Sequence, residues 1–178
     1  TGTLLLCLPF SLRNPAEVSL FTAFFTSVSA SCVTGLVLVD TWTHWSFFGQ
    51  CILLSLIQVG GLGFMTICIA AVSVSHRKIG MSSRIVMQNA ISAPHMGGIV
   101  RMTRFVTAGT LLAETIGAVL LSFHFIPQLG PAEGIWYSIF HSVSAFCNAG
   151  FDLMGQFEPF GSLTVLSDHL LVNLTIMA

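Results

Sequence analysis

Phe25-Thr-Ser-Val-Ser-Ala-Ser-Cys-Val-Thr-Gly35 decides the fold, because the chain contains it a second time as Phe140-His-Ser-Val-Ser-Ala-Phe-Cys-Asn-Ala-Gly150. The identical residues keep one constant offset, and they are Phe25/Phe140, Ser27/Ser142, Val28/Val143, Ser29/Ser144, Ala30/Ala145, Cys32/Cys147 and Gly35/Gly150. A long irregular stretch repeated in this way indicates a duplicated structural unit.

The chain around the two copies is too apolar for a water-soluble domain. Of its 178 residues, 54% are hydrophobic and 7% are charged, whereas soluble domains carry about 25% charged residues. We therefore expect an all-α integral membrane protein. The chain begins at Thr1 without a recognisable signal peptide and stops inside an apolar run, so we expect a fragment of a longer protein.

The first repeat is predicted over residues 1–74. It starts with the end of a helix and continues with a short helix and an irregular loop over 17–40. This helix is too short to cross a bilayer, which needs about 20 apolar residues. We expect it to enter the membrane and return through the loop. Residues 45–74 carry no charge and predict an inner helix that spans the membrane, with a cluster at Gly60-Gly61-Leu-Gly63 for close packing or a bend.

The second repeat is predicted over residues 99–178. It comprises a helix over 99–126 that Pro127, Gly130 and Pro131 end, a pore helix and loop over 133–152, and the start of an inner helix at 169–178.

Between the repeats lies a linker, residues 75–98. The basic residues in and beside it are Arg77, Lys78, Arg84, Arg101 and Arg104. By the positive-inside rule the linker is cytoplasmic, and both loops then face outside.

A re-entrant loop of small residues can turn its backbone carbonyls toward an axis, where they replace the hydration shell of a cation. Gly35 and Gly150 supply the positive φ that such a loop demands. Thr34 adds a hydroxyl, and Asn148 can orient its own loop. The alternative is that both stretches are buried packing loops without contact to an ion.

Three stretches together resemble the membrane subunits of the Trk/Ktr/HKT potassium transporters, and most closely the Ktr type. They are Ser31-Cys-Val-Thr-Gly-Leu-Val-Leu-Val-Asp-Thr41, Gln58-Val-Gly-Gly-Leu-Gly-Phe-Met-Thr66 and Asn148-Ala-Gly-Phe-Asp-Leu153. The resemblance implies potassium-channel-like helix, pore-loop, helix repeats, four around one pore, of which this chain holds parts of two. It implies potassium uptake across the cell (inner) membrane by a multi-pass protein, with Na⁺ as an activating or coupled ion left open.

The resemblance also implies the site and the partners. The ion-binding backbone carbonyls of the selectivity filter fall on Cys32, Val33, Thr34, Gly35, Cys147, Asn148, Ala149 and Gly150. The expected partners are the lipid bilayer, a second copy in a homodimer, and a cytosolic ring of nucleotide-binding regulatory subunits. No nucleic acid is expected.

Three acidic residues stand apart from the filter. Asp40 and Asp152 follow the two loops and are predicted to attract cations outside, with solvated loop caps as the alternative. Glu114 is the one acid within a predicted full span. Because an unpaired acid in a membrane is unfavourable, we expect a structural ion pair or hydrogen bond with a residue in the rest of the protein. Direct ion handling and a protonated acid are the alternatives.

Two other classes compete with a potassium transporter. A membrane oxidoreductase or cytochrome-like subunit would need paired histidines on its helices, and His44, His124, His141 and His169 are not paired in this way. Another cation channel is the second alternative; a voltage-type potassium channel would carry a TVGYG-like run and an Arg-rich span, and the sequence has neither. The five cysteines predict no disulfide framework or transition-metal site. We expect no enzyme activity and no covalently bound cofactor, with K⁺ as the transported ion.

Overall fold

The structure, a computed structural model, describes residues 1–14, 19–63, 99–156 and 170–177. Regular structure in these residues is helical, with one isolated β-bridge between Leu12 and Trp45. Contacts divide the chain into two compact units, Thr1–Gly61 with Glu114–Ala178, and Leu62–Ala113. Both copies of the repeated stretch belong to the first unit. The predicted linker 75–98 lies outside the described residues.

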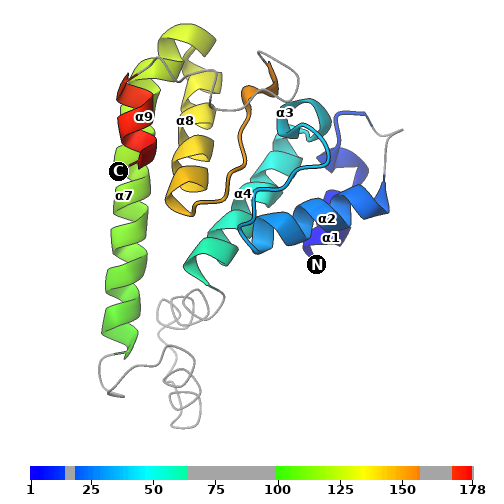
Figure 1. The fold of residues 1–178 in the computed structure, drawn as a ribbon, viewed down its shortest axis with the longest axis horizontal. Helices are drawn as coiled ribbons and strands as arrows, with labels where there is room; N and C mark the ends of the chain where they lie inside the picture. Colours follow the sequence, from blue (N-terminus) through cyan, green and yellow to red (C-terminus); the bar gives the residue numbers. More distant parts are fainter. Residues whose placement is uncertain (15–18, 64–98, 157–169, 178) are drawn as a thin grey trace. The chain divides into compact units, whose positions relative to one another are not determined.

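The first repeat folds as a series of helices around an irregular loop (Figure 1). Its elements are α1 (Gly2–Leu6), the 3₁₀ turn η1 (Pro9–Ser11), α2 (Leu20–Ser31), α3 (Thr41–His44) and α4 (Phe47–Leu62). The α2 helix begins where the Ser19 side chain accepts a hydrogen bond from the Thr22 amide, a typical N-cap. It is the predicted short helix, and the loop that follows separates it from α3. The predicted inner helix is described only as far as the end of α4.

The second repeat has the same order of elements. It comprises α7 (Ile99–Leu129), α8 (Pro131–Phe146), the 3₁₀ turn η3 (Met154–Gln156) and α9 (Leu170–Met177). The prediction that Pro127 ends the long helix is wrong, because α7 contains this proline and continues to Leu129. This proline removes the backbone donor that would bond to the carbonyl four residues earlier, and the helix ends two residues after it. The chain reverses instead at Gly130, whose φ of 85° is open to glycine.

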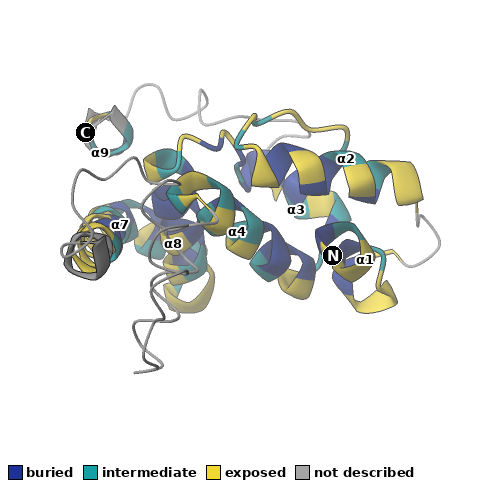
Figure 2. Cartoon of the chain, turned by 90° about the horizontal axis from the view of Figure 1, so that it is seen from below, coloured by how far each residue is buried: buried dark blue, intermediate teal, exposed yellow. Residues whose placement is uncertain are grey.

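Among the described residues, one helix segment is long and apolar enough to cross a membrane, Arg104–Leu129 of α7. Several helices have both exposed and buried faces (Figure 2), and many large apolar residues on them are exposed. On α2, Phe21 and Phe24 are exposed, whereas Ser27 and Ser29 are buried. Exposed apolar surface of this extent marks contact with lipid or with further protein.

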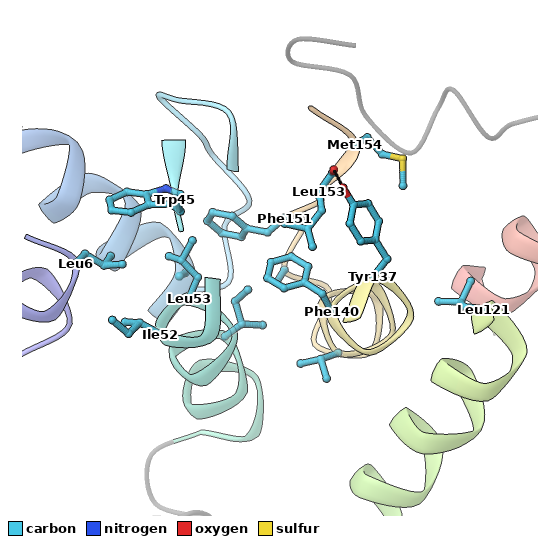
Figure 3. Packing of buried hydrophobic residues seen from close by; sticks show 14 of the residues in the cluster. Leu6, Trp45, Ile52, Leu53, Leu121, Tyr137, Phe140, Phe151, Leu153 and Met154 are labelled. Carbon is cyan, nitrogen blue, oxygen red and sulfur yellow. Dashed lines mark hydrogen bonds between the residues drawn. The ribbon is translucent and has the colours of Figure 1, made fainter. Parts of the chain in front are cut away.

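The core of the first unit lies between the two repeats. Trp45 and Leu53 come from the first repeat, and Tyr137, Phe140 and Phe151 from the second (Figure 3). All five side chains are almost completely buried. The two copies therefore pack as halves of one body, which fixes their loops relative to each other.

Candidate functional site

The two copies of the repeated stretch have the same backbone conformation. Val33 and Asn148, which are equivalent, both have φ of 55°, and the equivalent Gly35 and Gly150 have φ of 72° and 71°. A positive φ is uncommon outside glycine, and for the β-branched Val33 it is a strained conformation. Strain kept at matched positions indicates a backbone path that the fold imposes on both loops.

Matched hydrogen bonds form that path. The Thr34 amide donates to the Ser29 carbonyl at 3.0 Å, and the Ala149 amide donates to the Ser144 carbonyl at 2.7 Å. The helices α2 and α8 end in the same way, because the amides of Cys32 and Cys147 bond to carbonyls four residues earlier, at 2.8 Å and 2.9 Å.

The repeated serine in each copy has a structural role that the sequence did not reveal. The Ser29 hydroxyl donates to the Leu36 carbonyl at 2.7 Å, and the Ser144 hydroxyl donates to the Phe151 carbonyl at 2.5 Å. Each serine therefore ties the residue just after the loop glycine back to its own helix. In the sequence, this bond is indicated by the constant spacing between the serine and the glycine in the two copies.

The two loops meet at their glycines. A Cβ atom added to Gly35 would lie 2.8 Å from the Ala149 carbonyl oxygen and 3.2 Å from the Gly150 Cα. A Cβ atom added to Gly150 would lie 3.3 Å from the Gly35 Cα. The predicted filter residues thus gather in one place. Cys32, Thr34, Asn148 and Gly150 are exposed there, whereas Ala149 is buried.

The glycine pair of α4 lets this helix lie directly against both loops. A Cβ atom on Gly60 would collide with the Ser31 carbonyl, and one on Gly61 would collide with the Cys147 side chain. The prediction of close backbone approach at these glycines is confirmed. Gly63 follows the last residue of α4 with φ of 76°, and an added Cβ atom there meets no atom of the described residues within 4 Å.

Asp40 and Asp152 have different surroundings. The Asp40 carboxylate accepts hydrogen bonds from the Trp42 and Thr43 amides, both at 2.9 Å, so it caps α3. It packs against Gly155 of the second repeat so closely that a Cβ atom there would collide with it.

Asp152 accepts a hydrogen bond from the Met154 amide at 3.1 Å. Burial is the main cause that raises the pKa of Asp152 to about 6, and the charge of Asp40 adds to it, while the bond from Met154 acts in the opposite direction. At neutral pH this carboxylate is ionised, and it becomes neutral in mild acid.

Glu114 has a partner within this chain, which corrects the expectation of one elsewhere in the protein. The Gln58 amide nitrogen donates to its carboxylate at 2.8 Å, and the carboxylate is almost completely buried. The Ser142 hydroxyl donates to the backbone carbonyl of Glu114 at 2.6 Å. Glu114 therefore joins α7 to α4 and to α8.

The described histidines do not form a haem site. His141 has both ring nitrogens engaged by backbone, Nδ1 with the Tyr137 carbonyl and Nε2 with the Leu153 amide. His124 contacts Gln128, and His44 packs edge-to-face against Trp45, while His169 lies outside the described residues. The cysteines that the structure describes are free thiols.

Comparison with known proteins gives the family. The TrkH family, described as cation transport proteins, matches residues 4–170. Similar curated proteins are the potassium/sodium uptake protein NtpJ of Enterococcus hirae, 46% identical over 155 residues, and the Ktr system potassium uptake protein B of Bacillus subtilis, 42% identical over 152. The protein of the latter name from Vibrio alginolyticus is 36% identical over 156 residues.

These alignments cover 87%, 85% and 87% of this chain and 34% of each relative. The chain therefore spans about a third of the length of the relatives it matches. By the family match over most of its length, the chain belongs to the TrkH family of cation transport proteins, a family of transporters and not of enzymes.

Proposed function

We propose that this chain supplies two of the four loops of a selectivity filter through which potassium is taken up. The carbonyls of Cys32, Val33, Thr34 and Gly35 form one quarter of the filter. Those of the equivalent residues Cys147, Asn148, Ala149 and Gly150 form another. The observation that carries the proposal is the matched backbone of the two loops, with positive φ at equivalent positions and the two glycines in contact.

A loop with this backbone suits a cation for physical reasons. In the first loop Val33 and Gly35 have positive φ, and Thr34 between them does not. Such alternation lets successive carbonyls turn toward one side. Each pore helix directs its C-terminal end, with its partial negative charge, toward its own loop. The names of the relatives, potassium uptake and potassium/sodium uptake proteins, favour K⁺ as the transported ion, with Na⁺ transported or coupled as the alternative.

Asp40 and Asp152 follow the loops, and we assign them the outer mouth. Asp152 is the better candidate for attracting cations, because the amides of α3 already use the Asp40 carboxylate. Glu114 is assigned a structural role through Gln58.

The remaining organisation rests on the resemblance and the family. Repeats over 1–74 and 99–178 flank a cytoplasmic linker, 75–98, in a multi-pass protein of the cell membrane whose loops face outside. The names of two relatives refer to a Ktr system, which favours further components. We propose a homodimer and a cytosolic nucleotide-binding ring as those components.

The test is potassium uptake by a transport-deficient cell that expresses the full-length gene with Gly35→Ser. A left-handed conformation costs a non-glycine residue about 1–2 kcal/mol, and 1.4 kcal/mol is tenfold in affinity. We therefore expect the apparent affinity for K⁺ to fall about 5- to 30-fold, with weaker preference over Na⁺.

Gly109→Ser is the matched control, because an added Cβ atom at this helical glycine meets no atom of the described residues within 4 Å. It should leave affinity and preference unchanged. Unaltered potassium affinity and selectivity in Gly35→Ser would overturn the filter assignment.

A further inference from the structure

Three side chains on one face of α8 hold the chain that leaves the second loop. Tyr137, His141 and Ser144 follow one another at spacings of four and three residues, which places them on the same side of a helix. All three are buried. They bond to the backbone of the departing chain at Phe151 and Leu153, and the Tyr137 hydroxyl also lies 2.6 Å from the Gln156 side-chain oxygen. We call these three residues the α8 ladder.

Each of the three side chains of the α8 ladder makes a hydrogen bond to the backbone of the departing chain. The Tyr137 hydroxyl lies 3.0 Å from the Leu153 carbonyl oxygen, the bond drawn in Figure 3. The Leu153 amide donates to His141 Nε2 at 3.3 Å, and the Ser144 hydroxyl donates to the Phe151 carbonyl at 2.5 Å. Both polar groups of the Leu153 backbone are thus bound by the ladder. The segment after Gly150 has little freedom to rotate its peptide planes.

The bonds of His141 fix its tautomer. Its Nδ1 lies 2.8 Å from the Tyr137 carbonyl oxygen, which can only accept, so Nδ1 carries the hydrogen. Its Nε2 is then the acceptor that the Leu153 amide requires. The ring also stacks on Phe125, with centroids 5.4 Å apart and planes at 24°. A side chain held at both nitrogens and on its face is a rigid support.

The first repeat lacks two of these three side chains, the tyrosine and the histidine. Thr22 and Thr26 stand where the second repeat has Tyr137 and His141. The Thr26 hydroxyl donates to the Thr22 carbonyl within its own helix at 2.8 Å. Of the three rungs, the first repeat keeps the serine, through the bond from Ser29 to the Leu36 carbonyl.

We propose that Tyr137 and His141 are positioning residues that hold the second loop in its ion-selective conformation, and that selectivity depends on side-chain support of this loop more than of the first. The proposal rests on the proposed function of the two loops. Neither residue contacts the ion, because both act through the backbone of Leu153, three residues after Gly150. The repeat is therefore symmetric in the backbone of its loops and asymmetric in what supports them.

The experiment measures the ratio of apparent KM values for K⁺ and Na⁺, together with the maximal rate and the amount of protein in the membrane, in the full-length transporter. Tyr137→Phe removes one hydroxyl and keeps the ring. His141→Met removes both ring nitrogens, whereas His141→Gln keeps an acceptor for the Leu153 amide. Thr26→Val is the matched control in the first repeat, because it removes a hydroxyl that, among the described residues, bonds within α2.

We expect Tyr137→Phe and His141→Met to shift the KM ratio toward Na⁺ by about 3- to 10-fold, the equivalent of one lost buried hydrogen bond. His141→Gln should recover most of the preference, and Thr26→Val should keep the original ratio. A structural role alone would change the amount of protein and not the ratio. Loss of both Tyr137→Phe and His141→Met from the membrane would therefore overturn the proposal, as would an unchanged ratio in these variants or an equal shift in Thr26→Val.

Glycine variants separate this proposal from the proposed function. If Gly35→Ser and Gly150→Ser leave the ratio unchanged, the loops are not the filter, and both proposals fall. If the glycine variants shift the ratio and the ladder variants do not, only the role of Tyr137 and His141 is wrong.

Discussion

Replacing Gln58 by leucine should destabilise the transporter far more than replacing Glu114 by glutamine. In the structure the Gln58 amide donates to the buried Glu114 carboxylate at 2.8 Å. Leucine removes this donor and leaves the acid without it in an apolar span, where neither a charge nor an unmet polar group is well tolerated. Glutamine at position 114 keeps an oxygen that can accept the same bond.

The magnitude follows from the kind of bond that is lost. A hydrogen bond to a charged group contributes about 1.5–3 kcal/mol, so Gln58→Leu should lower the free energy of unfolding by about that amount. A chain of 150–250 residues loses about 2–4 °C in Tm per kcal/mol. For a unit of this size the fall is roughly 3–12 °C, and less for a longer chain. Glu114→Gln should stay within about 1 kcal/mol of the original, the value of an ordinary neutral hydrogen bond.

The assay is thermal unfolding of the purified full-length protein in detergent, paired with potassium uptake in cells. Ser55→Ala is the control on the same helix, since this exposed hydroxyl bonds to the Cys51 carbonyl one turn earlier in the part of the chain that the structure describes. The double variant with leucine at positions 58 and 114 should recover part of the loss, because no buried polar side chain then remains at either position. Equal Tm values for Gln58→Leu and Glu114→Gln, or no recovery in the double variant, would refute the assignment of this pair.

Two further predictions concern packing and pH. Gly60→Ala should lower the amount of folded transporter, because the added Cβ collides with the Ser31 backbone carbonyl, which cannot move as a side chain can. Gly109→Ala is the control, measured in parallel by membrane yield and Tm, and it should be neutral or slightly stabilising. Equal yields of the two variants would contradict the close approach at Gly60. The apparent affinity for K⁺ should fall as external pH drops through about 6, because Asp152 then takes up a proton and its negative charge is lost. Asp152→Asn should lower the affinity at pH 7.5 and flatten the dependence of K⁺ affinity on pH. If this dependence keeps its slope in the variant, the pH effect belongs to another group.

Much of the fold could be predicted because the duplication is visible in the amino-acid sequence. Two copies of an unusual stretch at one offset imply two copies of one backbone, and matched φ values at Val33 and Asn148 confirm it. The short helix of the first repeat was predictable from its length, since Leu20–Ser31 cannot cross a bilayer. The end of α7 was not predictable from Pro127 alone, because one lost backbone bond did not stop the helix and the reversal occurs at Gly130, whose φ is positive.

Parts of the site depended on contacts that no periodicity reveals. The partner of Glu114 is Gln58, which lies far away in the sequence and on another helix. A search for opposite charges could not find it, because the bond is made by a neutral amide. The rungs at Tyr137 and His141 were also missed, since they differ from the first repeat, and a search for shared residues passes over differences. Asp40 was predicted from its position after the loop, but its capping of α3 needed the coordinates.

The direction in which each helix faces is the last point that required the structure. In water, burial of apolar area sorts helix faces, and the Leu and Phe face turns inward. In lipid that driving force between helices is absent, and association depends on close packing and on hydrogen bonds between small and polar side chains. On α2 the buried residues include Thr26, Ser27 and Ser29, while Phe21 and Phe24 remain exposed. The serine-rich face turns inward because its hydroxyls are needed there: Ser29 donates to the loop that it supports. Ser29 and Ser144, which help to make the repeat recognisable in the sequence, therefore also hold each loop against its own helix.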